Sequence, residues 1–168
     1  VPLIIDSLVT MRKNKEDVHG FFVGGPLEWA HKYRKIALAK GLREDDFTFH
    51  GMVPSKLVPD AIAACDVCVY PAPEPKKAFF ARDTSPLKVF EYLAAGRPVV
   101  SADIPPLHGV LTKETVRLVH PGSVTSLTGG IREVLAKKSE AKARTARGLK
   151  LVQKHSWEKR MKRILDAL

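Results

Sequence analysis

Hydrophobic residues follow two alternating patterns along the first two thirds of the chain. Short apolar runs bounded by glycine or proline predict strands, and longer segments with apolar residues every three or four positions predict helices. The predicted strands are 19–23, 47–50, 66–70, 98–101 and 116–119, and the predicted helices between them are 2–15, 27–40, 55–64 and one that begins near Ser85. Because strands that alternate with helices form parallel sheets covered on both faces, the pattern predicts an α/β fold.

The order of the elements narrows this prediction. Three more helices are expected after the last strand, at 123–137, 139–154 and 157–167. The alternation is typical of a Rossmann-like, doubly wound sheet, but such a sheet has a first strand at its centre, and here a helix comes first. We therefore expect residues 1–168 to form a single domain, a fragment from which the first strand is missing.

Composition and charge limit the classes of function. The chain has 168 residues, of which 45% are hydrophobic and 27% charged, as in soluble globular proteins, and no apolar run approaches the roughly 20 residues that span a bilayer. The net charge is +10, with much of the excess in the last third. A solvated basic face explains this charge as well as an acidic partner does, either a phosphate-bearing ligand or an anionic membrane surface. Nucleic acid is not favoured, because charge alone supports it.

Cys65 and Cys68 form an isolated Cys-x-x-Cys pair where the helix 55–64 is expected to give way to a strand. A redox pair normally opens a helix, which lowers the thiol pKa, and a zinc site would need a second pair of ligands. We therefore expect buried, reduced thiols, which fit a reducing cytosol.

Ligands of such folds bind beyond the carboxyl ends of the strands, which gather along one edge of the sheet. This rule selects Gly24 and Gly25, then 51–54, the long loop 71–85, and 101–105.

The segment 85–100 has the strongest features of a ligand site. Ser85 suits the N-cap of a helix and Pro86 its first position, and Lys88 then places a cation near the helix N-terminus, where an anion such as phosphate binds. Glu91 lies among apolar residues, so we expect a buried carboxylate that needs hydrogen-bond donors from sugar hydroxyls or from the protein.

Five segments of the chain form an ordered set, 21–25, 47–53, 64–71, 85–100 and 155–158. The most specific of them is the run Ser-Pro-Leu-Lys-x-Phe-Glu-Tyr-x-Ala-x-Gly-x-Pro-Val-Val. Together they resemble the C-terminal, donor-binding domain of GT-B glycosyltransferases of the family 4 type (glycosyl transferases group 1).

This resemblance implies a hexosyltransferase that transfers a sugar, with retention of configuration, from a nucleotide-diphosphate sugar bound between two Rossmann-like domains. It implies no metal and no cofactor besides the donor substrate. The N-terminal acceptor domain is absent from this fragment, so we expect the terminal helix to pack against that domain and the fragment alone to be inactive. The implied location is the cytoplasm, including a peripheral position at the inner membrane face with a lipid-linked acceptor.

The resemblance also assigns roles to residues. Two acidic residues eight positions apart mark the site in this family. Glu91 matches the second, which binds the ribose, and Asp83 occupies the first, a catalytic position near the donor sugar where the family has Glu. Glu74 is a rival for that first position, because it closely follows Pro71.

The remaining donor-binding residues follow from the same comparison. The diphosphate is expected at Thr84, Ser85, Leu87 and Lys88, and Met52 and Val53 are expected to border the base. Gly24 and Gly25 are expected to bind the nucleotide sugar as well.

Other conspicuous residues are expected to be structural. The acidic triplet 44–46 is interpreted as a solvated turn, and Trp29 and Trp157 as packing anchors. His50 and His108 lie at or near the predicted edge, where a structural or solvated histidine is favoured over a catalytic one. The alternative function is a nucleotide-binding or interaction module without chemistry.

Overall fold

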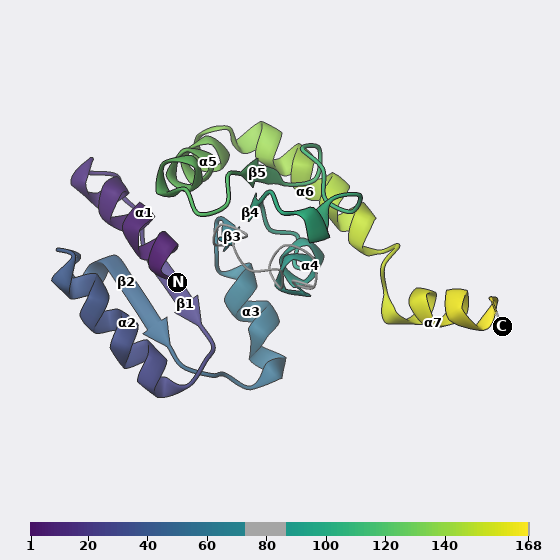
Figure 1. Cartoon of the computed structure of the whole chain (residues 1–168), viewed down its shortest axis with the longest axis horizontal. Coiled ribbons are helices and arrows are strands. Elements are labelled where there is room, and N and C mark those ends of the chain that lie inside the picture. Colours follow the sequence, from purple (N-terminus) through teal and green to yellow (C-terminus); the bar gives the residue numbers. More distant parts are fainter. Residues whose placement is uncertain (73–86, 168) are drawn as a thin grey trace.

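The computed structural model describes residues 1–72 and 87–167, in which parallel strands are flanked by helices (Figure 1). The strands are β1 (Gly20–Val23), β2 (Phe47–His50), β3 (Cys68–Tyr70), β4 (Val99–Ala102) and β5 (Arg117–Val119). The helices are α1 (Pro2–Lys13), α2 (Leu27–Ala39), α3 (Val58–Ala63), α4 (Leu87–Ala94), α5 (Val124–Ala136), α6 (Lys138–Val152) and α7 (Trp157–Leu165). The predicted α/β class and the order of its elements are confirmed.

Local chemistry explains where several helices begin. Ser123 and Ser156 cap α5 and α7, each accepting a hydrogen bond from the backbone N–H three residues later. The predicted helix 55–64 is instead a 3₁₀ turn, Ser55–Leu57, followed by α3. Pro59 lies in the first turn of α3, because only there does proline fit without removing a helical hydrogen bond.

The strands form two sheets. β1 pairs with β2, and β4 pairs with both β3 and β5, all in parallel. Within the described residues no strand pairs with the second edge of β1 or of β3. The described strands therefore do not form one continuous hydrogen-bonded sheet.

α1 packs against both sheets. Ile5 and Leu8 lie in one apolar cluster with Phe22 of β1, and Met11 lies in another with Val69 of β3. These clusters connect the two sheets through the buried side of a single helix.

β4 is the most deeply buried strand, with all four residues inaccessible to solvent. Successive residues of a strand point to opposite faces. Val99 packs with Val89 and Leu93 of α4, and Val100 packs with the cluster that contains Leu127 and other residues of α5. Helices therefore cover both faces of this sheet, as predicted.

The acidic turn 44–46 is solvated as interpreted except at its last residue. Glu44 and Asp45 are exposed, but Asp46 ends the 3₁₀ turn Glu44–Asp46 and is only 3% exposed. Its carboxylate lies 2.8 Å from Arg12 Nε and accepts a 2.8 Å hydrogen bond from the backbone N–H of Arg43. That backbone hydrogen bond is the main reason that the pKa of Asp46 is lowered. The burial of Asp46 was misjudged because the partner, Arg12, comes from a distant helix.

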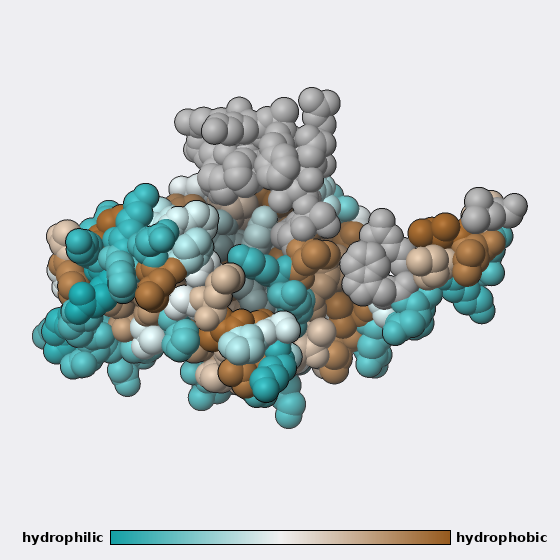
Figure 2. All heavy atoms as spheres, turned by 90° about the horizontal axis from the view of Figure 1, so that it is seen from below, coloured by the Kyte–Doolittle hydropathy of each residue, from teal (hydrophilic) through white to brown (hydrophobic). Residues whose placement is uncertain are grey.

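α7 extends away from the other elements (Figure 1). Met161, Ile164 and Leu165 are exposed on it. Figure 2 shows hydrophobic residues gathered on one side of this helix and hydrophilic residues on the other.

Two adjacent glycines in α5 test the packing of this helix on its sheet. A β-carbon on Gly130 would lie 2.5 Å from Val119 Cγ1 and 3.1 Å from Val100 Cγ1, whereas one on the exposed Gly129 would meet nothing within 4 Å. We expect Gly130→Ala to lower the free energy of unfolding by about 1–3 kcal/mol through overpacking. Gly129→Ala, the matched control, should raise it by about 0.5–1 kcal/mol, because alanine favours the helix. Urea unfolding measures both, and equal effects of the two substitutions would contradict this packing.

Candidate functional site

The loops after β1 and β2 meet at the carboxyl ends of these strands. Gly24 donates its backbone N–H to the carbonyl oxygens of His50 and Gly51, at 3.1 Å each. Gly24 and Gly25 have φ angles of 107° and 80°, which L side chains rarely adopt, so glycine is required for this turn. Met52, in the second loop, is 78% exposed, and Val53 is partly buried. The fold therefore brings these four predicted residues to one edge.

α4 places the described part of the segment 85–100. Val89 and Leu93, one helical turn apart, are fully buried against the sheet. Leu87, Lys88 and Glu91 are exposed instead.

The expectation that Glu91 is buried was therefore wrong. Residues three or four positions apart share one face of a helix, so Glu91 lies on the same side as Leu87 and Lys88, opposite the buried pair. Apolar neighbours in sequence suggested burial, but α4 spans only eight residues and buries a single stripe. Glu91 is exposed, and no hydrogen bond or ion pair joins it to another of the described residues.

Lys88 lies in the first turn of α4. The N-terminus of a helix carries a partial positive charge from the helix dipole, which adds to the charge of the lysine. The surroundings of Lys88 therefore favour an anion.

Four predicted residues lie outside the described residues. They are Glu74, Asp83, Thr84 and Ser85.

The loop after β4 holds an acid and a base together. His108 Nε2 lies 2.7 Å from Asp103 Oδ1, and both side chains are exposed. The 3₁₀ turn Pro105–Leu107 separates them, and it turns the chain so that they meet. Sequence reasoning selected both positions but not their pairing, because the Pro105-Pro106 pair marks a turn without revealing which side chains the turn brings together.

Trp29 is not a packing anchor. It is 57% exposed, in the first turn of α2, and its Cε3 atom would lie 3.2 Å from a β-carbon on Gly25. A helical side chain leans toward the N-terminus of its helix, which here directs the indole back over the loop of Gly24 and Gly25. Sequence reasoning missed this residue because tryptophan in a helix is usually buried.

The thiols of Cys65 and Cys68 are free, as predicted, with Cys68 buried and Cys65 partly so. Burial raises the pKa of Cys68 to about 12 and also raises that of Cys65. Tyr92 of α4 lies near them, and burial, followed by the effect of Cys68, raises its pKa to about 12. Since a redox-active thiol needs a lowered pKa, this pair is structural.

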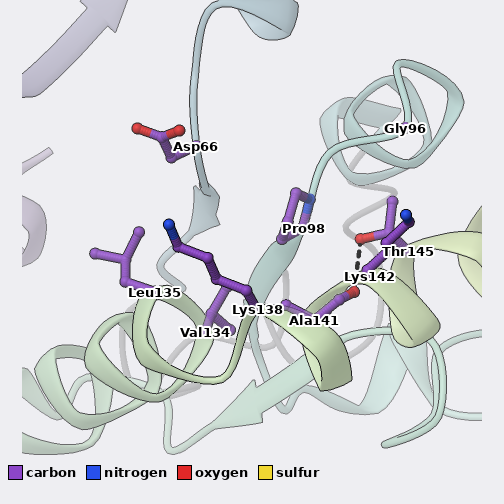
Figure 3. A pocket seen from close by; sticks show the side chains of 9 residues that line it. All are labelled: Asp66, Gly96, Pro98, Val134, Leu135, Lys138, Ala141, Lys142 and Thr145. Atoms are coloured by element: carbon purple, nitrogen blue, oxygen red, sulfur yellow. Dashed lines mark hydrogen bonds between the residues drawn. The ribbon is translucent and has the colours of Figure 1, made fainter.

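A hollow of about 460 Å³ lies at the opposite edge of the sheet (Figure 3). It is bordered by Asp66 before β3, by Pro98 before β4, and by Lys138 and Lys142 of α6. None of the predicted donor-binding residues lines it. We place the candidate site at the carboxyl edge instead, because there the glycine loops follow β1 and β2 and the exposed Lys88 and Glu91 lie on the helix that comes after β3.

Neither a membrane span nor a metal cluster is found in the part of the chain that the structure describes. No helix there is both long and apolar enough to cross a bilayer, and no three histidine, cysteine or acidic side chains are grouped as metal ligands.

Residues 1–137 match the family model described as glycosyl transferases group 1. No curated protein gives a significant match.

Solved structures share the fold. Sucrose-phosphate synthase from Thermosynechococcus elongatus matches with a TM-score of 0.75 and 23% identity, over 97% of this chain and 42% of that one. HepE from Anabaena, in complex with UDP-glucose, matches with a TM-score of 0.75 and 19% identity, over 99% of this chain and 44% of HepE. The catalytic domain of cholesterol-α-glucosyltransferase from Helicobacter pylori matches with a TM-score of 0.70 and 18% identity, over 92% of this chain and 89% of that domain. The chain thus spans less than half the length of the first two proteins.

The raised pKa of Cys68 predicts slow alkylation of its thiol. At pH 8.5 an unperturbed thiol, of pKa about 8.5, is half ionised, whereas Cys68 in the folded protein stays protonated. We expect iodoacetamide to modify Cys68 at least about 100-fold more slowly in the folded protein than in urea, as measured by peptide mass spectrometry. Because the folded pKa is raised, the neutral thiol stabilises the fold below about pH 8.5, and this contribution is lost as the pH rises toward 12. Equal rates in the folded and denatured protein would rule out a buried thiol.

Proposed function

The chain belongs to the glycosyl transferases group 1 family, and we propose that it binds a nucleotide-diphosphate sugar as the donor for sugar transfer. The observation that carries this proposal is the exposed face of α4. Lys88 and Glu91 lie there one turn apart, a cation and a carboxylate at the carboxyl edge of a parallel sheet. A nucleoside diphosphate offers a matching pair of groups, a diphosphate for the cation and ribose hydroxyls for the carboxylate.

Lys88 would bind the diphosphate. Lys88 lies in the first turn of α4, so the charge of the side chain and the dipole of that helix act on the same anion. Sugar transfer breaks the bond between the anomeric carbon and the diphosphate oxygen, and negative charge grows on that oxygen. A fixed cation beside the diphosphate stabilises this leaving group, which is the main electrostatic requirement of the step.

Glu91 would bind the ribose. A carboxylate accepts hydrogen bonds from two adjacent hydroxyls, and charge-assisted bonds are stronger than neutral ones. Its exposure supports this role, because a carboxylate without partners among the described residues can accept donors from a ligand.

The glycine loops would hold the rest of the nucleotide. Gly24 and Gly25 present backbone without side chains, which allows a ligand to approach closely. Met52 and Val53 border the region where the base would lie, and their main chain is the expected contact.

The remaining parts of the proposal rest on the family. They comprise a retaining mechanism with Asp83 or Glu74 as the acid near the donor sugar, hexose as the sugar, and no metal. An N-terminal domain would supply the acceptor site, and the apolar side of α7 would pack against it. A cytoplasmic location, at an anionic membrane surface if the acceptor is linked to lipid, suits the positive charge. A binding module without chemistry is the alternative, which would bind nucleotides but show no turnover in the full-length protein.

Substitutions in α4 test the donor site. We expect Lys88→Met and Glu91→Gln each to weaken binding of UDP or GDP, whichever binds, by about 10- to 100-fold in isothermal titration calorimetry, because each removes a charge-assisted interaction worth about 1.5–3 kcal/mol. Lys150→Met, which removes an exposed lysine of α6, serves as the control and should leave affinity unchanged. Unaltered affinity in both α4 variants would refute these assignments.

The 168-residue chain by itself should bind the donor without transferring sugar. Acceptor groups would come from a second domain, so bringing both substrates together requires that domain. Product analysis with a radiolabelled nucleotide sugar measures this, and turnover by the chain alone would show that it contains a complete active site.

A further inference from the structure

Three large apolar side chains surround the two glycine loops without being buried. Leu27 and Trp29, in the first turn of α2, are 62% and 57% exposed, and Met52, in the loop after β2, is 78% exposed. Leu27 lies against Gly51, its Cδ1 atom 3.5 Å from where a β-carbon would be, and Trp29 lies against Gly25. Since the two loops are joined through the Gly24 hydrogen bonds, these side chains border one small region of the edge.

The indole of Trp29 lies close to Gly25. A β-carbon on Gly25 would lie 3.2 Å from Trp29 Cε3 and 3.9 Å from Cδ2 and Cζ3, so a side chain there would crowd the ring. More than half of the side chain remains in contact with solvent. The glycine therefore supports a flat aromatic surface at the edge where the donor is expected.

From this geometry we infer that Trp29 is a stacking platform for the nucleobase of the donor. The inference rests on the proposed nucleotide-binding function and adds a residue to it. An indole offers a large rigid surface and loses little conformational entropy on binding, and aromatic rings stack on any base because every base has a π face. Trp29 would thus contribute affinity for a nucleoside diphosphate without selecting uracil over guanine.

Fluorescence of a single tryptophan tests the inference directly. The chain has two tryptophans, so Trp157→Phe leaves Trp29 as its only indole. In this background, titration with UDP or GDP should quench the emission with a midpoint equal to the dissociation constant from calorimetry. Inorganic pyrophosphate, which has no base, should leave the emission unchanged.

Calorimetry of Trp29 variants gives an independent readout. We expect Trp29→Ala to weaken nucleoside-diphosphate binding by about 10-fold or more and to leave pyrophosphate binding unchanged, and Trp29→Phe to restore most of the affinity. Met161→Ala is the matched control, because Met161 is also 57% exposed but lies on α7. Circular dichroism checks that each variant is folded.

The outcomes separate this inference from the function on which it rests. If the nucleotide binds but Trp29→Ala binds it equally well, or if pyrophosphate quenches Trp29 as strongly as the nucleotide does, stacking is refuted and the donor site stands. If neither UDP nor GDP produces heat with the unaltered protein, the proposed donor site fails, and stacking fails with it.

Discussion

The burial of α1 against both sheets is the constraint on which the rest of the described structure depends. Among residues 1–72 and 87–167 no hydrogen-bonded strand pair joins the two sheets, so side chains must hold these parts together. Ile5 and Met11 are almost completely buried, one on the side of β1 and the other on the side of β3. Polar contacts fix the same helix at its C-terminal end, where Arg12 binds Asp46, and just beyond it, where Arg132 Nε donates to Glu16 at 2.9 Å.

This arrangement determines where a ligand can bind. Parallel strands place their carboxyl ends at one edge of each sheet, and α1 keeps the two edges in a fixed relation. Val89 and Leu93 then anchor α4 on its sheet, which turns Lys88 and Glu91 outward. The packing of the apolar side chains therefore exposes the charged ones, because residues on the side of a helix opposite its buried stripe face solvent.

Several features of the candidate site could be predicted from the sequence because short-range chemistry determines them. Gly24 and Gly25 were placed correctly at the end of a strand, since the positive φ angles of such a turn favour glycine. The positions of Met52 and Lys88 were predicted in the same way, from the end of a strand and the start of a helix. The observed boundaries of strands and helices differ from the predicted ones by a few residues at most. The exposure of Glu91 could not be predicted, because apolar neighbours in sequence do not reveal which stripe of a short helix meets the sheet.

The sequence by itself determined the order of strands and helices, the parallel α/β class and the edge at which the glycine loops and α4 lie. Periodicity, capping residues and turn glycines act over a few residues, so they can be recognised without a partner. Only the tertiary structure decided that the strands divide into two sheets, that Asp46 is buried against Arg12, and that Glu91 and Trp29 face solvent. Burial depends on which distant element covers a given face, and that information lies in the packing of the whole chain and not in any local pattern.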